Sequence, residues 1–250
     1  MIRLIHAEFL KLRTTQVWFW MLIATIAVSG LLVVGQIAPH DGVRTTGQVP
    51  DLFASSVTVY LVVFVLGVLG VTTEFRYQTI TPTVLQTPSR WAIVTAKMIT
   101  YTIVGIIYAA VAVAVQLAVA IPWLKAKDVT VHLGNGHVRH AILGVFIVVA
   151  LFGIIGLGIG ALLRNQIVAV VVGILFLLVI QNIFIAIPVV KEIYPYLPGG
   201  ASNAVLYTSG QDTFNGVHIL NTAGGVVVLL LWAFVPAVAG AAFTMNRDIT

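Results

Sequence analysis

The side chains best suited to a specific interaction lie between two long apolar stretches, at positions 74–97. Glu74 and Arg76 directly follow the first of these stretches, and Arg90 and Lys97 precede the second. Carboxylates, guanidinium groups and ammonium groups at such a boundary can form ion pairs or bind a charged partner surface. The segment carries no nucleophile and base at a recognisable spacing. Its residues therefore favour binding over catalysis.

Two threonine–proline pairs divide this segment into helices. Thr81-Pro82 and Thr87-Pro88 each resemble a helix start, with threonine as the N-cap and proline in the first helical position, where its missing amide proton costs nothing. The pattern predicts a short helix at about residues 82–86 and a second helix that continues from Pro88 into the next apolar stretch. A short polar helix flanked by arginines is shaped to contact another protein.

Motifs for common enzyme chemistry are absent from the sequence. It contains no G-x-x-x-x-G-K-[ST], so the chain itself cannot hydrolyse a nucleoside triphosphate by the P-loop mechanism, and neither H-E-x-x-H nor G-x-S-x-G occurs. His132, His137 and His140 could hold zinc, but no carboxylate or cysteine accompanies them at a ligand spacing, which favours a solvated loop. We expect no metal site, no bound cofactor and no catalytic activity in this chain.

The composition is that of a membrane protein. Apolar residues make up 60% of the 250 positions, charged residues only 8%, and the mean hydropathy is +1.06. The net charge of +5 is distributed between the apolar stretches, which does not indicate nucleic-acid binding. Cysteine is absent, which excludes disulfides and thiolate metal sites.

Six stretches are long enough to cross a bilayer as helices, for which about 20 apolar residues are needed. We therefore predict an all-α membrane protein with a single transmembrane domain. Only residues 163–166 separate the fourth and fifth spans, which predicts a tight helical hairpin, and residues 189–221 are expected to form an external cap. The predicted spans are residues 17–37, 53–73, 99–121, 141–162, 167–188 and 222–243.

Charge placement predicts the orientation, because cationic loops resist translocation. Eight of the thirteen Lys and Arg residues fall on the side that carries both termini, so we expect both termini in the cytoplasm. Residues 1–13 are expected to form an elbow helix in the membrane interface, because Ile2, Ile5, Phe9 and Leu12 recur at helical spacing. The alternative is an ordinary charged flank that fixes topology.

At positions 74–97 the sequence resembles the permease subunits of type-2 ABC (ATP-binding-cassette) transporters, an exporter class with six spans per subunit. The family pattern has an acid and a base after the second span, then Gly-Thr-Ile/Leu, a short helix, Pro-Ser-Arg, and Ala-Lys at the third span. Gln78 occupies the position where the family commonly has glycine. The matching residues are Glu74, Arg76, Thr79, Ile80, Leu85, Pro88, Ser89, Arg90, Ala96 and Lys97.

The resemblance extends to residues 7–13, to Tyr196-Leu-Pro198 and to Arg247-Asp248. It implies that residues 74–97 contain a cytoplasmic coupling helix, which binds a separate ATPase dimer carrying ATP and Mg²⁺. It also implies a second permease copy or a paralogue, and the cytoplasmic membrane of a bacterium. The alternative for the basic residues is that they only determine topology. The residues that the resemblance assigns to ATPase coupling are Glu74, Arg76, Thr79, Ile80, Leu85, Pro88 and Arg90.

Polar groups inside the spans need partners, because lipid offers none. In related exporters the second and fifth spans flank the path between two subunits, so Ser55, Thr58, Gln181 and Asn182 are candidate substrate contacts; interhelical hydrogen bonding is the alternative. A G-x-x-x-G motif at Gly156 and Gly160 predicts close helix packing, either within one subunit or between two.

These observations favour an ABC exporter permease that moves a solute and breaks no bond itself. An ATPase-independent six-helix channel or carrier is the alternative, although the span centres lack the charged groups that ion-coupled carriers usually need. A membrane-embedded enzyme has less support, because no nucleophile, base and metal set converges. The sequence is compatible with drugs, peptides, lipids or glycans as substrates, and with a homodimer or a heterodimer.

Overall fold

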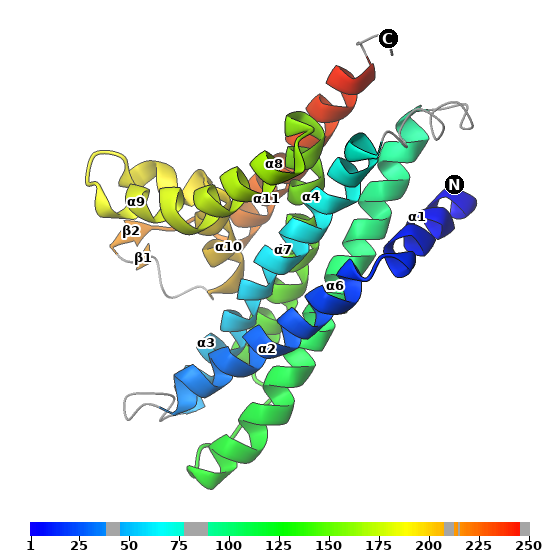
Figure 1. Cartoon of the computed structure of the whole chain (residues 1–250). Coiled ribbons are helices and arrows are strands. Elements are labelled where there is room, and N and C mark those ends of the chain that lie inside the picture. Colours follow the sequence, from blue (N-terminus) through cyan, green and yellow to red (C-terminus); the bar gives the residue numbers. More distant parts are fainter. Residues whose placement is uncertain (39–45, 78–89, 208–212, 215, 246–250) are drawn as a thin grey trace.

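The computed structural model describes residues 1–38, 46–77, 90–207, 213–214 and 216–245. Within these ranges, six helices are long and apolar enough to cross a membrane, which confirms the predicted fold class (Figure 1). Most of their surface-exposed residues are apolar, as expected for helices whose solvent is lipid.

The first three spans follow a short N-terminal helix, α1 (Ile2–Thr14). The first span is α2 (Val17–Ile37), and a 3₁₀ turn at Thr46–Gln48 precedes the second. The second span is built from α3 (Val49–Ala54), the 3₁₀ turn η2 (Ser55–Val59) and α4 (Tyr60–Arg76). The third is α6 (Arg90–Ala126), which at 37 residues is longer than a bilayer requires.

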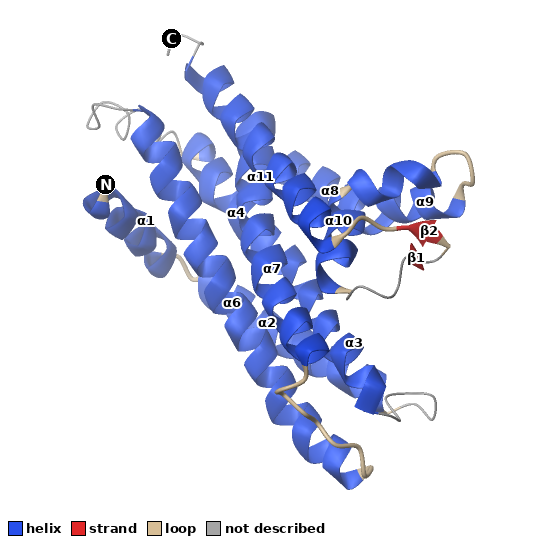
Figure 2. Ribbon diagram, turned by 180° about the vertical axis from the view of Figure 1, so that it is seen from behind, coloured by secondary structure: helices blue, strands red, loops and turns tan. Residues whose placement is uncertain are grey.

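The last three spans begin with α7 (Gly136–Leu163). The fifth span combines α8 (Gln166–Leu175), the π-helical stretch η3 (Phe176–Ile180) and α9 (Gln181–Ala186). The sixth is α11 (Thr222–Met245). The end of α4, the start of α6, α1 and the end of α11 lie toward one end of the bundle, as both views show (Figures 1 and 2).

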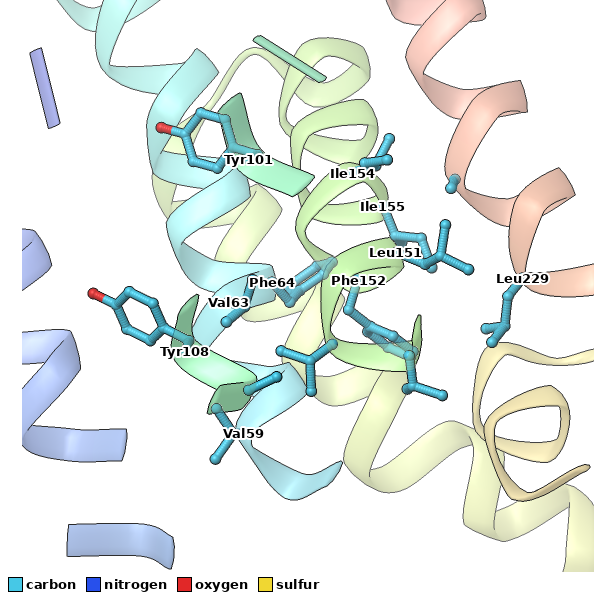
Figure 3. Close-up of a cluster of buried hydrophobic side chains, with 14 of the residues drawn as sticks. Val59, Val63, Phe64, Tyr101, Tyr108, Leu151, Phe152, Ile154, Ile155 and Leu229 are labelled. Carbon is cyan, nitrogen blue, oxygen red and sulfur yellow. The ribbon is translucent and has the colours of Figure 1, made fainter. Parts of the chain in front are cut away.

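Helix α7 is the centre of the bundle and packs against α4, α6 and α11. It is apolar on all sides, as expected for a helix surrounded by other helices. Its Phe152 lies beside Tyr60 of the second span, with ring centroids 4.3 Å apart, and is part of a large apolar core (Figure 3). A Cβ atom on Gly156 would lie 2.1 Å from the backbone oxygen of Phe64, so glycine here permits direct contact between α4 and α7. The G-x-x-x-G motif therefore packs within this chain.

The predicted hairpin between the fourth and fifth spans is confirmed. Helix α7 ends at Leu163, and Arg164 adopts the left-handed conformation typical of a helix end (φ 51°). The side chain of Asn165 then accepts a hydrogen bond from the backbone amide of Val168 at 3.1 Å and so caps α8. A connection of two residues leads from α7 into α8, which runs outward from the bundle (Figure 1).

The connection between the fifth and sixth spans contains its own secondary structure. A 3₁₀ helix, η4 (Lys191–Tyr196), leads into α10 (Pro198–Leu206), which is mostly buried and packs against α7 and α11. Two short antiparallel strands follow, β1 (Thr213–Phe214) and β2 (Val217–His218). Part of the segment predicted as an external cap is therefore packed into the bundle.

Helix α1 lies along α6 (Figure 2), and its Phe9 and Leu12 pack against the edge of the large apolar core. Ile5, Phe9 and Leu12, which the sequence places on its apolar stripe, are half-buried, whereas Ile2 is 84% exposed. The apolar stripe of α1 thus faces the other helices over most of its length.

Candidate functional site

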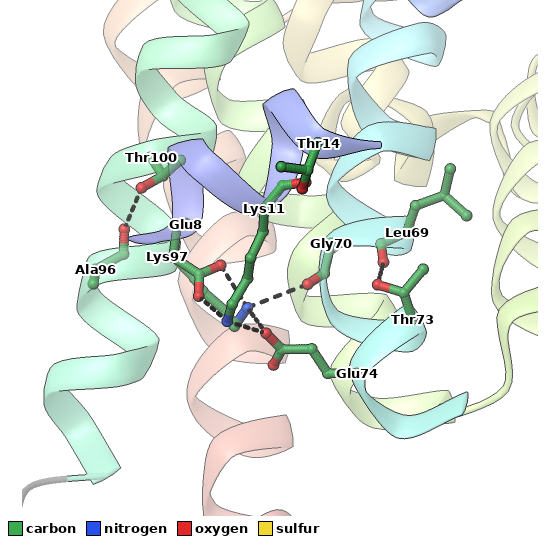
Figure 4. A network of polar contacts seen from close by, with 10 residues as sticks. All are labelled: Glu8, Lys11, Thr14, Leu69, Gly70, Thr73, Glu74, Ala96, Lys97 and Thr100. Carbon is green, nitrogen blue, oxygen red and sulfur yellow. Dashed lines mark hydrogen bonds and ion pairs between the residues drawn. The ribbon is translucent and has the colours of Figure 1, made fainter. Parts of the chain in front are cut away.

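Four charged side chains form a compact cluster where α1, α4 and α6 meet. Glu8 and Lys11 come from α1, Glu74 from the last turns of α4, and Lys97 from the early turns of α6 (Figure 4). We refer to these four residues as the ionic cluster. It contains two acids and two bases, so its formal charge is zero.

Each lysine of the ionic cluster bridges both carboxylates. Lys97 Nζ donates hydrogen bonds to Glu8 Oε2 and to Glu74 Oε1, each at 2.7 Å. Lys11 Nζ donates to Glu8 Oε1 at 2.7 Å and to Glu74 Oε1 at 2.8 Å. These distances are typical of short, charge-assisted hydrogen bonds. The result is a closed network that joins three helices.

Three members of the ionic cluster are almost completely removed from solvent. Glu8 and Glu74 are each 6% exposed and Lys97 is 5% exposed, whereas the side chain of Lys11 is 46% exposed. Burying such charges is costly unless each is paired, and removing one partner leaves an uncompensated charge. Burial lowers the pKa of Lys11, but its bonds to Glu74 and Glu8 outweigh this effect and hold that pKa above its usual 10.5.

Backbone and aromatic groups of α4 and α6 complete the surroundings of Lys97. Its ammonium group also donates to the backbone oxygen of Gly70 at 3.2 Å. The buried ring of Tyr101, one turn further along α6, lies directly against Gly70, where a Cβ atom would come within 1.8 Å of the tyrosine oxygen. Because Gly70 has no side chain, both Lys97 and Tyr101 can approach the backbone of α4 at this position.

The ionic cluster lies where the segment between α4 and α6 leaves and rejoins the bundle. Helix α4 ends at Arg76 and α6 begins at Arg90, so the pair between Glu74 and Lys97 joins the two ends of the segment between them. The pairs formed by Glu8 connect α1 to the same point. The arrangement offers no activated nucleophile, and its chemistry is that of a buried electrostatic clamp.

The structure places the predicted coupling residues unequally. Glu74 lies in the ionic cluster, while Arg76 is exposed and donates to the side chain of Gln166 at 3.5 Å, next to the α7–α8 turn. Arg90 is the first residue of α6. The predicted coupling helix lies outside the described residues, as do four of the seven predicted coupling residues, namely Thr79, Ile80, Leu85 and Pro88.

Sequence reasoning did not bring Glu8, Lys11 and Lys97 together with Glu74. One signal for Glu8 was nevertheless available. It falls three residues after Ile5 and four before Leu12, which places a carboxylate on the apolar stripe of α1. A charge at such a position requires a buried partner of opposite sign. The sequence alone does not say which lysine supplies it.

The four candidate substrate contacts do not converge on one site. Ser55 accepts a hydrogen bond from Gln116 of α6 at 3.3 Å, and Thr58 donates to the backbone oxygen of Ser55 at 3.0 Å. Gln181 is buried and its side-chain oxygen accepts a hydrogen bond from the backbone amide of Gly199 on α10. Asn182 is exposed on the fifth span and donates to the backbone oxygen of Leu178 at 2.6 Å.

His132, before α7, and His137 and His140, in its first turns, do not form a metal site with their described surroundings. Within the described residues, His, Asp and Glu side chains do not gather in groups of three or more that could hold a metal ion. This includes His132, His137 and His140, all of which lie in described parts of the chain.

Comparison with known proteins gives one result that covers most of the chain. The family model described as "ABC-2 family transporter protein" matches residues 4–182, a range that begins in α1 and ends in the fifth span. All four residues of the ionic cluster lie within it. No curated protein matches the chain.

Proposed function

The chain belongs to the ABC-2 family of transporter proteins, and from this premise we propose that it is the permease subunit of a bacterial ABC exporter driven by a separate ATPase. The chain is a multi-pass membrane component of a transporter, and its sequence has no P-loop of its own. ATP and Mg²⁺ would bind to a cytoplasmic ATPase dimer, and this chain would form the translocation path with a second permease copy or a paralogue. It would not be catalytic itself.

The observation that carries this proposal is the clamp between Glu74 and Lys97. A force applied to the segment after Arg76 reaches α4 and α6 along the backbone, and the ion pair between Glu74 Oε1 and Lys97 Nζ, 2.7 Å apart, ties these two helices together. Through Glu8 it also reaches α1. A pushed segment fixed at both ends moves three helices together, whereas an unfixed loop would absorb the motion. We infer that the ionic cluster holds the two ends of the coupling segment in a fixed position relative to α1, α4 and α6.

The polar residues of the spans have separable roles in this proposal. Ser55 and Gln181 already bond other helices, which is the structural role that buried polar groups commonly have in membranes. Asn182 is exposed on the fifth span and is therefore the strongest candidate of the four for contact with a substrate or the second permease subunit.

The first test asks whether an ATPase partner exists. The tagged chain is purified in a mild detergent from its native membranes, and the proteins that accompany it are identified by mass spectrometry. We expect a P-loop ATPase in stoichiometric amount. Purification of the chain without such a partner, together with gradient-driven transport by the chain alone in liposomes, would establish the ATPase-independent carrier instead.

The second test asks whether the segment after α4 transmits force. Arg76→Glu is introduced together with a substitution of Leu85, and ATP turnover and transport are measured in the complex. Arg139→Glu is the matched control, because Arg139 is an equally exposed arginine near the start of α7, at the opposite end of that helix from the α7–α8 turn. We expect loss of transport-coupled ATP turnover only in the first variant. Equal turnover in both would contradict the coupling role.

A further inference from the structure

A cavity opens between the second, fourth, fifth and sixth spans, and no residue of the ionic cluster lines it. Its volume is about 300 Å³. Its wall is formed by residues of α4, α7, α8, η3 and α11, with Pro198 of α10. We call this cavity the apolar slot.

The apolar slot runs from the core to the surface of the bundle. At its inner end lie Phe64, Ile155 and Leu177, which are only 1%, 2% and 5% exposed; Figure 3 labels the first two. At its mouth lie Leu163 and Val172, which are 40% and 48% exposed. This rise in the exposed fraction of the wall residues shows that the slot is open to the surface, unlike a closed packing defect. Because the surrounding helices are membrane spans, the mouth lies on the membrane-facing surface of the single chain.

The wall of the slot presents only apolar surface. Its residues are aliphatic or aromatic apart from glycine and proline, and the single polar side-chain atom among them, Trp232 Nε1, donates to the backbone oxygen of Tyr196 at 2.9 Å. A sugar, peptide or ion would lose its hydration there without a replacement partner. Apolar cavities of this kind stay dry and accept apolar ligands.

The fifth span departs from a regular α-helix at the slot. The π-helical stretch Phe176–Ile180 supplies three of the wall residues, and such stretches frequently occur at functional sites. Within it, the ring of Phe176 is held 5.8 Å from the ring of Trp232 on α11.

We propose that the apolar slot binds one alkyl chain of a bilayer phospholipid, which enters at Val172 and reaches Leu177 and Ile155. The wall offers only apolar contacts from its exposed mouth to its buried inner end, which suits a hydrocarbon chain. The headgroup remains outside at the level of the membrane surface. This inference requires only that the chain spans a membrane, and it does not depend on ATPase coupling.

The test uses the intact chain in nanodiscs of phosphatidylcholine doped with a phosphatidylcholine that carries a diazirine in its acyl chain. After irradiation and digestion, mass spectrometry locates the cross-linked residues. Val172→Trp blocks the mouth, and Val171→Trp is the matched control, since Val171 is the neighbouring residue, is 49% exposed and is not part of the wall. We expect adducts at Leu177 and Ile155 that fall about ten-fold in Val172→Trp and are unchanged in Val171→Trp.

Three outcomes would overturn the proposal. The first is labelling of Leu177 and Ile155 that is no stronger than the labelling of Val171 on the outer face. The second is an equal decrease of this labelling in Val172→Trp and Val171→Trp. The third is cross-linking of the slot to a second copy of the chain, which would make it a subunit contact. If Val172→Trp does not yield folded protein, judged by size-exclusion chromatography, Val172→Phe and Val171→Phe replace the pair and the same difference is required.

Discussion

At the scale of single residues, the stability of the ionic cluster depends on its equal numbers of acids and bases, two of each. Replacing Lys97 by methionine keeps much of its volume but leaves two buried carboxylates with only Lys11 between them. We expect this variant to lose about 3–5 kcal/mol of stability, the usual cost of breaking a buried pair by removing one partner. The measurement is the midpoint of thermal unfolding in detergent, followed by size-exclusion chromatography of heated samples.

The control for this prediction restores the charge balance of the cluster without restoring the ion pair between Glu74 and Lys97. Glu74→Gln combined with Lys97→Met leaves one acid and one base, Glu8 and Lys11, which still bond each other at 2.7 Å. We expect the double variant to be more stable than Lys97→Met alone, because it carries no uncompensated charge. A double variant that is less stable than the single one would show that charge balance is not what holds this site together.

The protonation of Lys11 offers a second test at the same scale. Its pKa is held above 10.5 by Glu74 and Glu8 against the opposing effect of burial. A raised pKa in the folded state means that the stabilisation is fully present below 10.5 and is lost as the pH rises through the raised value. In Glu74→Gln we expect the pKa of Lys11 to fall. Competitive acetylation of the amine, followed by mass spectrometry across a pH series, measures it directly.

At the scale of helices, close contact between α4 and α7 depends on glycine. A Cβ atom at Gly156 would lie 2.1 Å from the backbone oxygen of Phe64, so the two helices must separate to admit one. We expect Gly156→Ala to destabilise the bundle by about 1–3 kcal/mol through overpacking. Gly134→Ala is the control, because a Cβ atom there meets nothing within 4 Å. Equal unfolding midpoints for the two variants would disprove the importance of this contact.

The sequence predicted those helical features that depend on local pattern. Length and hydropathy were sufficient for six spans, and Leu163-Arg-Asn-Gln166 was sufficient for the hairpin, because turn and cap chemistry is local. The ionic cluster could not be derived in this way, since Glu8 and Lys97 are 89 positions apart and nothing local pairs them. Helix α10 was also missed. Pro198 and the following glycines read as helix breakers, yet Pro198 occupies the first turn, where proline is tolerated, and the glycines allow close packing.

At the scale of the whole molecule, the arrangement of charges predicts how the chain sits in the bilayer. Eight of its thirteen basic residues are assigned to the end that carries both termini and the ionic cluster. We expect this end to face the cytoplasm. A fluorescent protein fused to the C-terminus should fluoresce, and alkaline phosphatase inserted near Gly134 should be active. The reverse pattern of activities would place the ionic cluster outside the cytoplasm, where it could not contact a cytoplasmic ATPase.

The contacts of Glu8 also bear on how the protein is made. The ribosome synthesises Glu8 early, but the lysine that buries it appears 89 residues later, after two further spans. At ordinary translation rates this interval lasts roughly 4–18 s. During that time Glu8 can pair only with Lys11 of its own helix, so its buried contact with α6 forms only after the third span has been synthesised.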